Sequence, residues 1–388
     1  YGPKESLAYT ARRVVPAYSA LARVFTEVKR RRPNFNPKSL LDFGSGPAPS
    51  VWSSDNVWPG SLGFSNGAFS LIEPSRSMSE LGRDLLNTKR KKKDNDVSVS
   101  ESGNDSNNDT GGQNFDGRYG GATNTQIRRW STLREFVAHS PSSTEMDDEE
   151  NVSTSLQGHH LHDIVLASNV ISELGTDHSR DAALEILWHL TAPGGMLILL
   201  ERGNQWGSNV VNRGRELVLA QDASAAVVAP CTHRESCPLL KAVYPDGDEA
   251  EIFDAEGKRK TPTGRYSTTW CHFGHRSGDE TIRRLVGNRS SQHKPSYDKF
   301  SYMVLEKRVD SGEGEGTGSL INCIKEESQW GRIVRPPLRR GKHVVMDLCA
   351  SSGAMERRTF GKKKHKKDGV YRAARKAEYG ALWPEVVD

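Results

Sequence analysis

Residues 40–48 of the chain read Leu40-Leu41-Asp42-Phe43-Gly44-Ser45-Gly46-Pro47-Ala48. It places an acidic residue at the end of a short apolar run and two glycines in the turn beyond it. Glycine lets the backbone turn sharply and lets a ligand approach the main chain closely. The pattern predicts a buried strand followed by a ligand-binding turn. The alternative is a tight strand-to-helix turn in which the glycines have only a structural role.

Further short apolar runs predict the other strands of the same sheet. The expected strands cover residues 39–43, 69–73, 162–168, 195–201 and 300–306. Most are continuous apolar runs rather than strict alternations, which is typical of strands covered on both faces. Residues 181–190 indicate a helix between two strands, and residues 9–31 indicate one or two helices around Pro16. Alternating strands and helices predict a doubly wound α/β sheet.

Composition limits the remaining possibilities. Of the 388 residues, 35% are apolar and 27% are charged, a low ratio that predicts polar segments outside the packed core. A low-complexity insertion is expected at residues 87–125, and surface loops are expected at residues 140–157 and 310–318. Because no apolar run is long enough to span a bilayer, no membrane partner is expected.

The turn resembles motif I of class I S-adenosylmethionine-dependent methyltransferases, because it has the form D-x-G-x-G and lacks the third glycine of dinucleotide-binding turns. Glu73, at the end of the next expected strand, matches the acidic residue that those enzymes use on the two ribose hydroxyls. The segment after residue 168 is expected to face the methyl-transfer position. The resemblance implies an S-adenosylmethionine site formed by Asp42, Gly44, Gly46, Glu73, Ser168 and Asn169.

The sequence does not assign a catalytic residue. The segment that begins at Ser168 lacks the Pro-Pro-aromatic arrangement with which adenine methyltransferases hold an extruded base. Ala229-Pro230-Cys231 is superficially similar to the Pro-Cys of cytosine methyltransferases, but it lies beyond the fifth expected strand instead of the fourth. Methyl transfer is therefore left as an open possibility.

Four cysteines from separate segments suggest a metal site. Cys231 and Cys237 share a turn-rich segment, Cys271 lies in a Trp-Cys-His setting, and Cys349 ends an expected strand at residues 342–348. Sulfur donors suit zinc or an iron–sulfur cluster, and the spacing does not match a zinc ribbon. The alternative is that the thiols are small buried apolar groups, as we expect for Cys323. Three neighbouring histidines, His233, His272 and His275, could substitute as ligands, but each is expected to be a supporting donor or a solvated loop residue.

The C-terminal part of the chain is strongly basic. Residues 332–376 contain fifteen Lys and Arg against three acidic residues. Repeated cations on one module are typical of proteins that bind the phosphate backbone of nucleic acids, whereas a solvated charge run is the alternative. The residues expected to bind RNA are Arg335, Arg339, Arg340, Lys342, Arg357, Arg358, Arg372, Arg375 and Lys376.

In this order, the motifs resemble the methyltransferase-like family of mitochondrial small-ribosomal-subunit assembly proteins. The most specific blocks are VVAPCTHRESCPL, WCHFGHR and RIVRPPLRRGKHVVMDLC. The resemblance implies a Rossmann-like methyltransferase domain, a location in the mitochondrial matrix, and association with small-subunit rRNA on the mitochondrial small ribosomal subunit. It also implies a [4Fe–4S] cluster with Cys231, Cys237, Cys271 and Cys349 as ligands.

The expected organisation has three parts. Residues 1–37 form an N-terminal helical segment. Residues 38–310 form a Rossmann-like class I methyltransferase domain of the α/β class, with a cysteine-rich segment at residues 229–275. Residues 319–388 form a small basic β/α module that binds RNA. The favoured function is that of a mitochondrial assembly or translation factor, monomeric outside the ribosome. An active rRNA methyltransferase and a zinc-stabilised RNA-binding protein are the alternatives.

Overall fold

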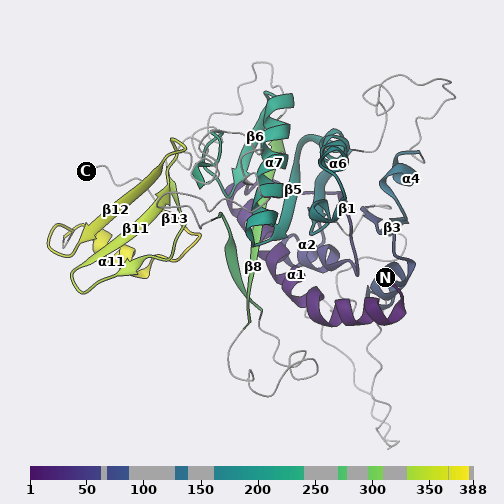
Figure 1. Cartoon of the computed structure of the whole chain (residues 1–388), viewed down its shortest axis with the longest axis horizontal. Helices are drawn as coiled ribbons and strands as arrows, with labels where there is room; N and C mark the ends of the chain where they lie inside the picture. The colour runs from purple at the N-terminus through teal and green to yellow at the C-terminus, as the bar shows by residue number, and fades with distance from the viewer. Residues whose placement is uncertain are drawn as a thin grey trace, which may run out of the picture.

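Two β-sheets organise the chain in the computed structural model (Figure 1). The structure describes residues 1–62, 68–86, 127–138, 161–239, 270–277, 296–308, 330–365 and 367–383. The first sheet has the strand order β3-β2-β1-β4-β5-β8-β6, with β7 paired to β8. Its strands are β1 (Leu40–Phe43), β2 (Phe69–Ile72), β3 (Ile127–Trp130), β4 (His162–Ser168), β5 (Thr191–Arg202), β6 (Ala225–Ala229), β7 (Phe273–Ser277) and β8 (Ser296–Lys307).

Strand directions identify the fold class. Strands β3, β2, β1, β4 and β5 are parallel, whereas β8 is antiparallel to β5 and β6, between which it lies. The strand order of this sheet reverses between β1 and β4. In parallel sheets, ligands bind beyond the carboxyl ends of the strands, at the place where the order reverses. The expected Rossmann-like class I methyltransferase sheet is confirmed.

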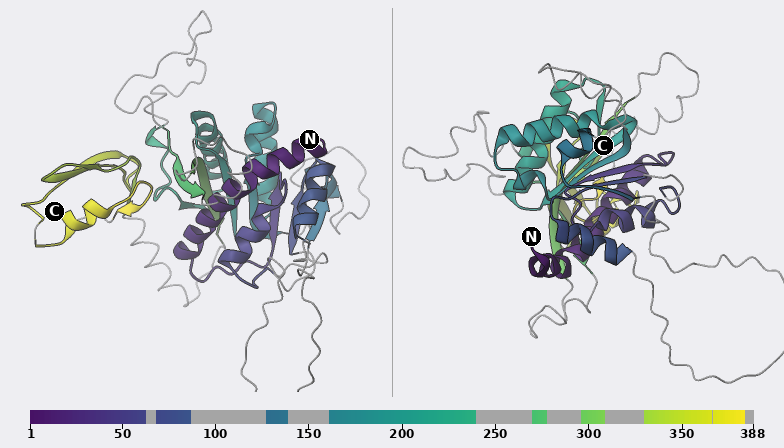
Figure 2. Two further views of the ribbon diagram at one scale, coloured as in Figure 1. Left: turned by 90° about the horizontal axis from the view of Figure 1, so that it is seen from below. Right: turned by 90° about the vertical axis from the view of Figure 1, so that its right-hand side faces the viewer.

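Helices cover both faces of this sheet, as the two views in Figure 2 show. One core contains residues of α1 (Pro3–Arg31), α2 (Pro49–Val57) and α3 (Arg76–Leu86). The opposite core contains residues of α4 (Leu133–Ala138), α6 (Asp177–His189) and α7 (Gln205–Gln221). Neighbouring strand residues alternate between the cores: Leu40 packs into the first and Leu41 into the second. This alternation explains why the strands are continuous apolar runs.

Helix α1 is a single helix that continues through Pro16. Its carboxyl-terminal half packs into the first core through fully buried apolar side chains such as Leu21, Phe25 and Val28. Its amino-terminal half passes the carboxyl ends of the strands, and Leu7 there is largely exposed. The same helix therefore contributes both to the core and to the edge of the sheet at which ligands bind in this fold.

The second sheet belongs to the C-terminal part of the chain and has the order β10-β11-β9-β13, with β12 paired to β11. Its elements are β9 (Gly331–Ile333), β10 (Leu338–Arg339), β11 (His343–Cys349), β12 (Met355–Gly361), α11 (Val370–Lys376) and β13 (Leu382–Trp383). Ile333, Met346, Phe360 and Trp383 belong to its own small core. The module lies beside the β6 end of the first sheet (Figure 1).

Several sequence expectations fall outside the described residues. These are the low-complexity insertion at residues 87–125, the polar stretches at 140–157 and 310–318, and Cys323. The cysteine-rich segment is described only at both of its ends, so its character as an insertion stays a prediction, as do the domain boundaries. Within the described ranges, no helix has the length and apolar character needed to cross a membrane.

Candidate functional site

The glycine turn after β1 adopts a left-handed backbone that explains its composition. Gly44 has φ +75° and Gly46 has φ +52°. A Cβ atom at Gly44 would lie 2.6 Å from Cβ of Val170, so the turn packs too closely there for a side chain. A Cβ at Gly46 would meet no atom within 4 Å. Gly44 is therefore required by packing, and Gly46 leaves open space beside the turn.

Glu73 joins this turn as the sequence predicts. Its Oε2 accepts a hydrogen bond from the Gly46 amide at 2.8 Å, and its Oε1 accepts one from the Ser75 amide at 2.8 Å. Burial raises the pKa of Glu73, and these two bonds oppose that effect. Each carboxylate oxygen keeps a further lone pair for a ligand hydroxyl. The carboxylate is thus held in place and is still able to accept hydrogen bonds.

Asp42 lies beneath the turn with an oxygen that lacks a partner. Its Oδ2 accepts a hydrogen bond from Ser50 Oγ at 2.5 Å, whereas its buried Oδ1 has no hydrogen-bond partner among the described residues. Burial raises the pKa of Asp42 to about 7. A ligand donor at the turn would satisfy Oδ1, because buried polar atoms are normally hydrogen-bonded.

The space beside the turn is narrow, about 20 Å³, and helix α1 forms one wall of it. Tyr9, Arg13 and Ala17 line it opposite the glycines, together with Ser168 and Asn169. Arg13 is half-buried and makes no hydrogen bond or ion pair to any residue that the structure describes. Sequence reasoning missed Tyr9 and Arg13, because nothing in their local pattern indicates a contact with a turn thirty residues further along the chain.

A larger cavity of about 290 Å³ adjoins the first at the carboxyl end of β5 and the amino end of β8. It shares Tyr9, Arg13, Ala17 and Asn169 with the narrow space, so the two are continuous along α1. Asn169 has φ +55°, a left-handed conformation that is uncommon outside glycine and clusters at functional sites. Asn169 lines both cavities, and its place at the methyl-transfer position stays a prediction.

The wall of the larger cavity carries charges of both signs. Arg202 and Lys299 are exposed at its rim. Glu201 lies deeper, where its carboxylate accepts hydrogen bonds from the Ser172 amide at 3.0 Å and the Ser172 hydroxyl at 2.7 Å. Burial raises the pKa of Glu201, and the Ser172 bonds oppose that shift. No expected site residue other than Asn169 lines this cavity, so the sequence did not reveal it.

The four expected cysteine ligands come together, and none of them forms a disulfide with a described residue. Cys231 and Cys237 follow β6, Cys271 precedes β7, and Cys349 ends β11. Burial raises the pKa of Cys271 well above its usual value, and Cys231, Cys237 and Cys349 raise it further. The thiols therefore lie close enough to influence one another, although they come from both sheets. Among the described residues, no set of three or more His, Cys, Asp or Glu side chains is arranged to hold a metal ion.

The loop that carries Cys231 and Cys237 is fixed from the first sheet by Arg215 of α7. This side chain is fully buried and donates to the carbonyl of His233 at 3.2 Å and to that of Glu235 at 2.5 Å. From the second sheet, Cys349 Sγ lies 3.2 Å from His233 Nε2. His233 is thus in the supporting position expected for it, whereas His275 lies in the wall of the larger cavity.

Arg332 connects the second sheet to the first beside the cysteines. It donates to the carbonyls of Pro230 at 2.8 Å and Gly380 at 2.7 Å, and to Glu27 Oε1 at 2.5 Å. Tyr302 of β8 donates to Glu27 Oε2 at 2.7 Å. This buried network, which we call the Glu27–Arg332 network, joins α1, β8 and β9 to the residue that precedes Cys231.

Several of the expected RNA-binding cations are engaged within the module. Arg357 forms two hydrogen bonds to Asp347, at 2.6 and 2.7 Å, and Arg335 lies 3.7 Å from the same carboxylate. Arg358 pairs with Glu356, and Arg339 donates to the carbonyls of residues 375 and 377. The Arg375 side chain donates to the carbonyl of residue 340. Among the described residues, the side chains without such partners are those of Arg340, Lys342, Arg372 and Lys376.

Known proteins resemble the chain over most of its length. The human protein named "Ribosome assembly protein METTL17, mitochondrial" is 24% identical over 386 residues, covering 98% of this chain and 62% of the human protein. The Saccharomyces cerevisiae protein named "Ribosome assembly protein RSM22, mitochondrial" is 23% identical over 297 residues, covering 60% of this chain and 46% of the yeast protein. The chain therefore spans less than two thirds of the length of either relative.

Among solved structures, an O-methyltransferase from Bacillus cereus in complex with SAH is 11% identical, with a TM-score of 0.35, and the match covers 78% of this chain and 90% of the enzyme.

The family comparison includes every site described above. The family described as "Mitochondrial small ribosomal subunit Rsm22" matches residues 3–107, 125–248 and 259–384. These ranges contain the glycine turn, the four cysteines and the basic module. The relatives are named as mitochondrial proteins, in agreement with the expected location. The chain belongs to the Rsm22 family of the mitochondrial small ribosomal subunit.

Proposed function

We propose that this chain is an assembly factor of the mitochondrial small ribosomal subunit. In this proposal a methyltransferase-like sheet binds S-adenosylmethionine, and a cysteine-held metal centre orients a basic module that binds small-subunit rRNA. The observation that carries the proposal is the convergence of four thiols, three of them buried, at the joint between the two sheets. Family membership and the names of the relatives support the ribosomal role.

The donor set fits an iron–sulfur centre chemically, because it consists of four thiols drawn from three separate segments. A [4Fe–4S] cluster bound by Cys231, Cys237, Cys271 and Cys349 would supply a covalent cross-link between the sheets. The chain's own contribution is to hold the ligand loops: Arg215 fixes the first of them, and Arg332 fixes the backbone just before Cys231. Loss of the metal should therefore loosen the joint without unfolding either sheet.

The basic module supplies the cations for RNA. Arg340, Lys342, Arg372 and Lys376 are free to contact phosphates, whereas Arg357 is engaged with Asp347 and stabilises the module itself. Phosphate contacts depend on where the cations lie relative to the RNA backbone. A rigid joint between the two sheets would therefore let the cations bind the RNA as one surface.

The glycine turn fits the nucleoside end of S-adenosylmethionine. Gly46 leaves open space, Glu73 retains lone pairs for ribose hydroxyls, and Asp42 Oδ1 lacks a partner. Because the space measures only about 20 Å³, binding requires the side chains of Tyr9 and Arg13 to move aside.

The test compares Cys349→Ser with Cys323→Ser in the full chain, using small-subunit rRNA transcribed in vitro. We expect the Cys349 variant to bind the rRNA at least about tenfold more weakly, because each tenfold step corresponds to about 1.4 kcal/mol and several phosphate contacts depend on the joint. The Cys323 variant is the matched control and should bind like the unchanged chain. Equal rRNA affinity of both variants would refute the role of the cysteine joint.

A second function is that of an active rRNA methyltransferase, and the larger cavity beside Asn169 favours it. The test is transfer of a labelled methyl group from S-adenosylmethionine to small-subunit rRNA by the unchanged chain and by Gly44→Arg. A side chain at residue 44 collides with Val170, so this variant should lose cofactor binding. Transfer that disappears in Gly44→Arg identifies an enzyme, whereas cofactor binding without transfer leaves the assembly role alone.

A further inference from the structure

An exposed tryptophan stands at the same sheet edge as the larger cavity. Trp206 lies in the first turn of α7 and has 48% of its surface exposed. It follows Asn204, which lines the cavity, by two residues. The exposed part of this ring offers an aromatic face on which a nucleic-acid base can stack. The Arg180 guanidinium lies 4.8 Å from the centre of the ring, so the ring is packed on a cation.

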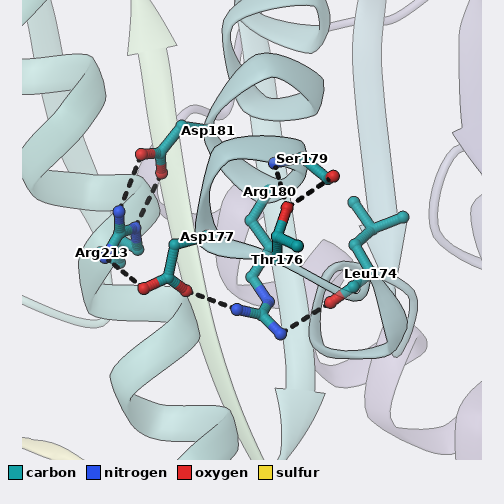
Figure 3. A network of polar contacts seen from close by, with 7 residues as sticks. All are labelled: Leu174, Thr176, Asp177, Ser179, Arg180, Asp181 and Arg213. Carbon is teal, nitrogen blue, oxygen red and sulfur yellow. Dashed lines mark hydrogen bonds and ion pairs between the residues drawn. The ribbon is translucent and has the colours of Figure 1, made fainter.

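The guanidinium beneath the ring is held in place by a polar network (Figure 3). Arg180 pairs with Asp177 and donates to the carbonyl of Leu174 at 2.6 Å. Asp177 is also 3.3 Å from Arg213 of α7, and Arg213 donates to Asp181 at 2.7 and 2.8 Å. The network joins α6 to α7 and fixes the cation on which Trp206 rests. A fixed aromatic surface loses little side-chain entropy when it binds a ligand.

The rim of the neighbouring cavity is suited to anions. Arg202 and Lys299 are exposed there, and neither side chain has a hydrogen bond or an ion pair with the described residues. Arg13 adds a third cation from α1. Of the two carboxylates in the wall, Glu201 is bonded to Ser172, and Asp298 interacts with His275. The cations therefore remain available to a ligand.

We propose that the larger cavity and the Trp206 ring together bind single-stranded RNA, with one nucleotide in the cavity and a neighbouring base stacked on the ring. Aromatic rings combined with a positively charged groove are the means by which proteins bind single strands, because every base has a face for stacking. A cavity of about 290 Å³ has room for one nucleotide and excludes a base-paired helix. Arg202 and Lys299 would contact the flanking phosphates.

This inference rests on the proposed function, since it adds an RNA site to a chain proposed to bind rRNA. It is nevertheless a separate site, because it lies at the carboxyl edge of the first sheet and uses none of the cations of the basic module. Two sites on one chain raise the affinity for a long RNA when both can be occupied together. A short oligonucleotide that reaches only one site separates their contributions.

The experiment measures binding of a labelled single-stranded RNA of roughly eight nucleotides to the full chain by fluorescence anisotropy. Trp206→Ala should weaken binding about tenfold, and Trp206→Phe should retain most of the affinity because it keeps an aromatic face. Leu161→Ala is the matched control, since Leu161 is 45% exposed and lies at the amino end of β4, on the opposite edge of the sheet. It should leave the affinity unchanged.

A second variant keeps the test decisive if Trp206→Ala lowers stability. Arg202→Gln combined with Lys299→Gln should weaken binding and reduce its salt dependence, because two phosphate contacts are lost. Binding of the short RNA that is unchanged in both Trp206→Ala and the double variant would overturn the inference.

The outcome is also distinguishable from a failure of the proposed function. Arg372→Gln combined with Lys376→Gln should lower affinity for full-length small-subunit rRNA but leave the Trp206 effect on the short RNA intact. If the basic-module variant loses rRNA binding while Trp206→Ala changes nothing, the inference is wrong and the proposed function stands. If Trp206→Phe binds as weakly as Trp206→Ala, stacking is not the mode of binding and the inference is also wrong.

Discussion

At the scale of single residues, Glu27 has the most consequential environment. Burial alone would raise its pKa, but the charges of Arg332 and Arg31 and the hydrogen bonds from Tyr302 and Arg332 outweigh burial and lower the pKa to about 2. In the sequence this glutamate is one charged residue in a helix. Arg31 lies one helical turn away, but Tyr302 and Arg332 lie 275 and 305 residues away, so no local pattern predicts these two partners.

The depressed pKa predicts a pH-dependent stability. The ion pairs stabilise the folded chain fully above the pKa of the unfolded glutamate, about 4.5, and this contribution is lost as the pH falls toward 2. Over that window we expect on the order of 3 kcal/mol of unfolding free energy to disappear. Urea unfolding at a series of pH values measures it.

Two variants isolate this effect. Glu27→Gln should be less stable at neutral pH and should show a smaller loss between about pH 5 and pH 2. Glu80→Gln removes an exposed ion pair with Arg76. Its unfolding free energy should depend on pH in the same way as that of the unchanged chain. If the unfolding free energy changed with pH equally in Glu27→Gln and the unchanged chain, the lowered pKa of Glu27 would be contradicted.

Residue-scale prediction succeeded where the motif was local. Gly44, Gly46 and Glu73 are neighbours in the structure because the carboxyl ends of parallel strands meet at one edge. Arg335, Arg357 and Arg358 illustrate the opposite case. Their charge was visible in the sequence, but their acidic partners on β11 and β12 depend on strand pairing that composition does not reveal.

At the scale of elements, the strands that are continuous apolar runs could be predicted, including the short β1 and β2, whereas β3 could not. β4 matches its expected range of 162–168, and β5 and β8 extend beyond theirs. β3 was missed because Ile127–Trp130 contains two arginines and lies at the edge of the sheet. The position of α1 against the glycine turn was also missed, because helix packing depends on tertiary contacts rather than on local pattern.

Helix α7 supports the Cys231–Cys237 loop through the side chain of Arg215. Arg215→Gln leaves two carbonyls of the Cys231–Cys237 loop, one of them buried, without their donor, so we expect a loss of about 2 kcal/mol of unfolding free energy and a reduced metal content. Thermal unfolding and metal analysis of the purified variant provide the measurement.

Arg213→Gln on the same helix is the matched control, because its partner Asp181 is partly exposed and its loss should cost less than about 1 kcal/mol. Full metal content in Arg215→Gln would show that the loop does not depend on α7.

At the scale of the whole molecule, the two sheets are joined where the cysteines converge. The Glu27–Arg332 network fixes one side of this joint, and the Tyr379 hydroxyl donates to the carbonyl of His272, beside Cys271. The Tyr379 ring also stacks on the Phe273 ring, with 6.1 Å between the two ring centroids. These contacts hold the ligand segments before any metal binds, so a metal centre would strengthen an existing connection rather than create it.

The metal-centred joint is tested by the iron, sulfide and zinc content of the full chain purified without oxygen, together with its absorption spectrum. We expect about four irons and four sulfides per chain with a broad visible band, and their loss in Cys349→Ser. One zinc per chain without iron would contradict the cluster and favour a zinc-stabilised protein. Absence of any bound metal would contradict the metal-centred joint altogether.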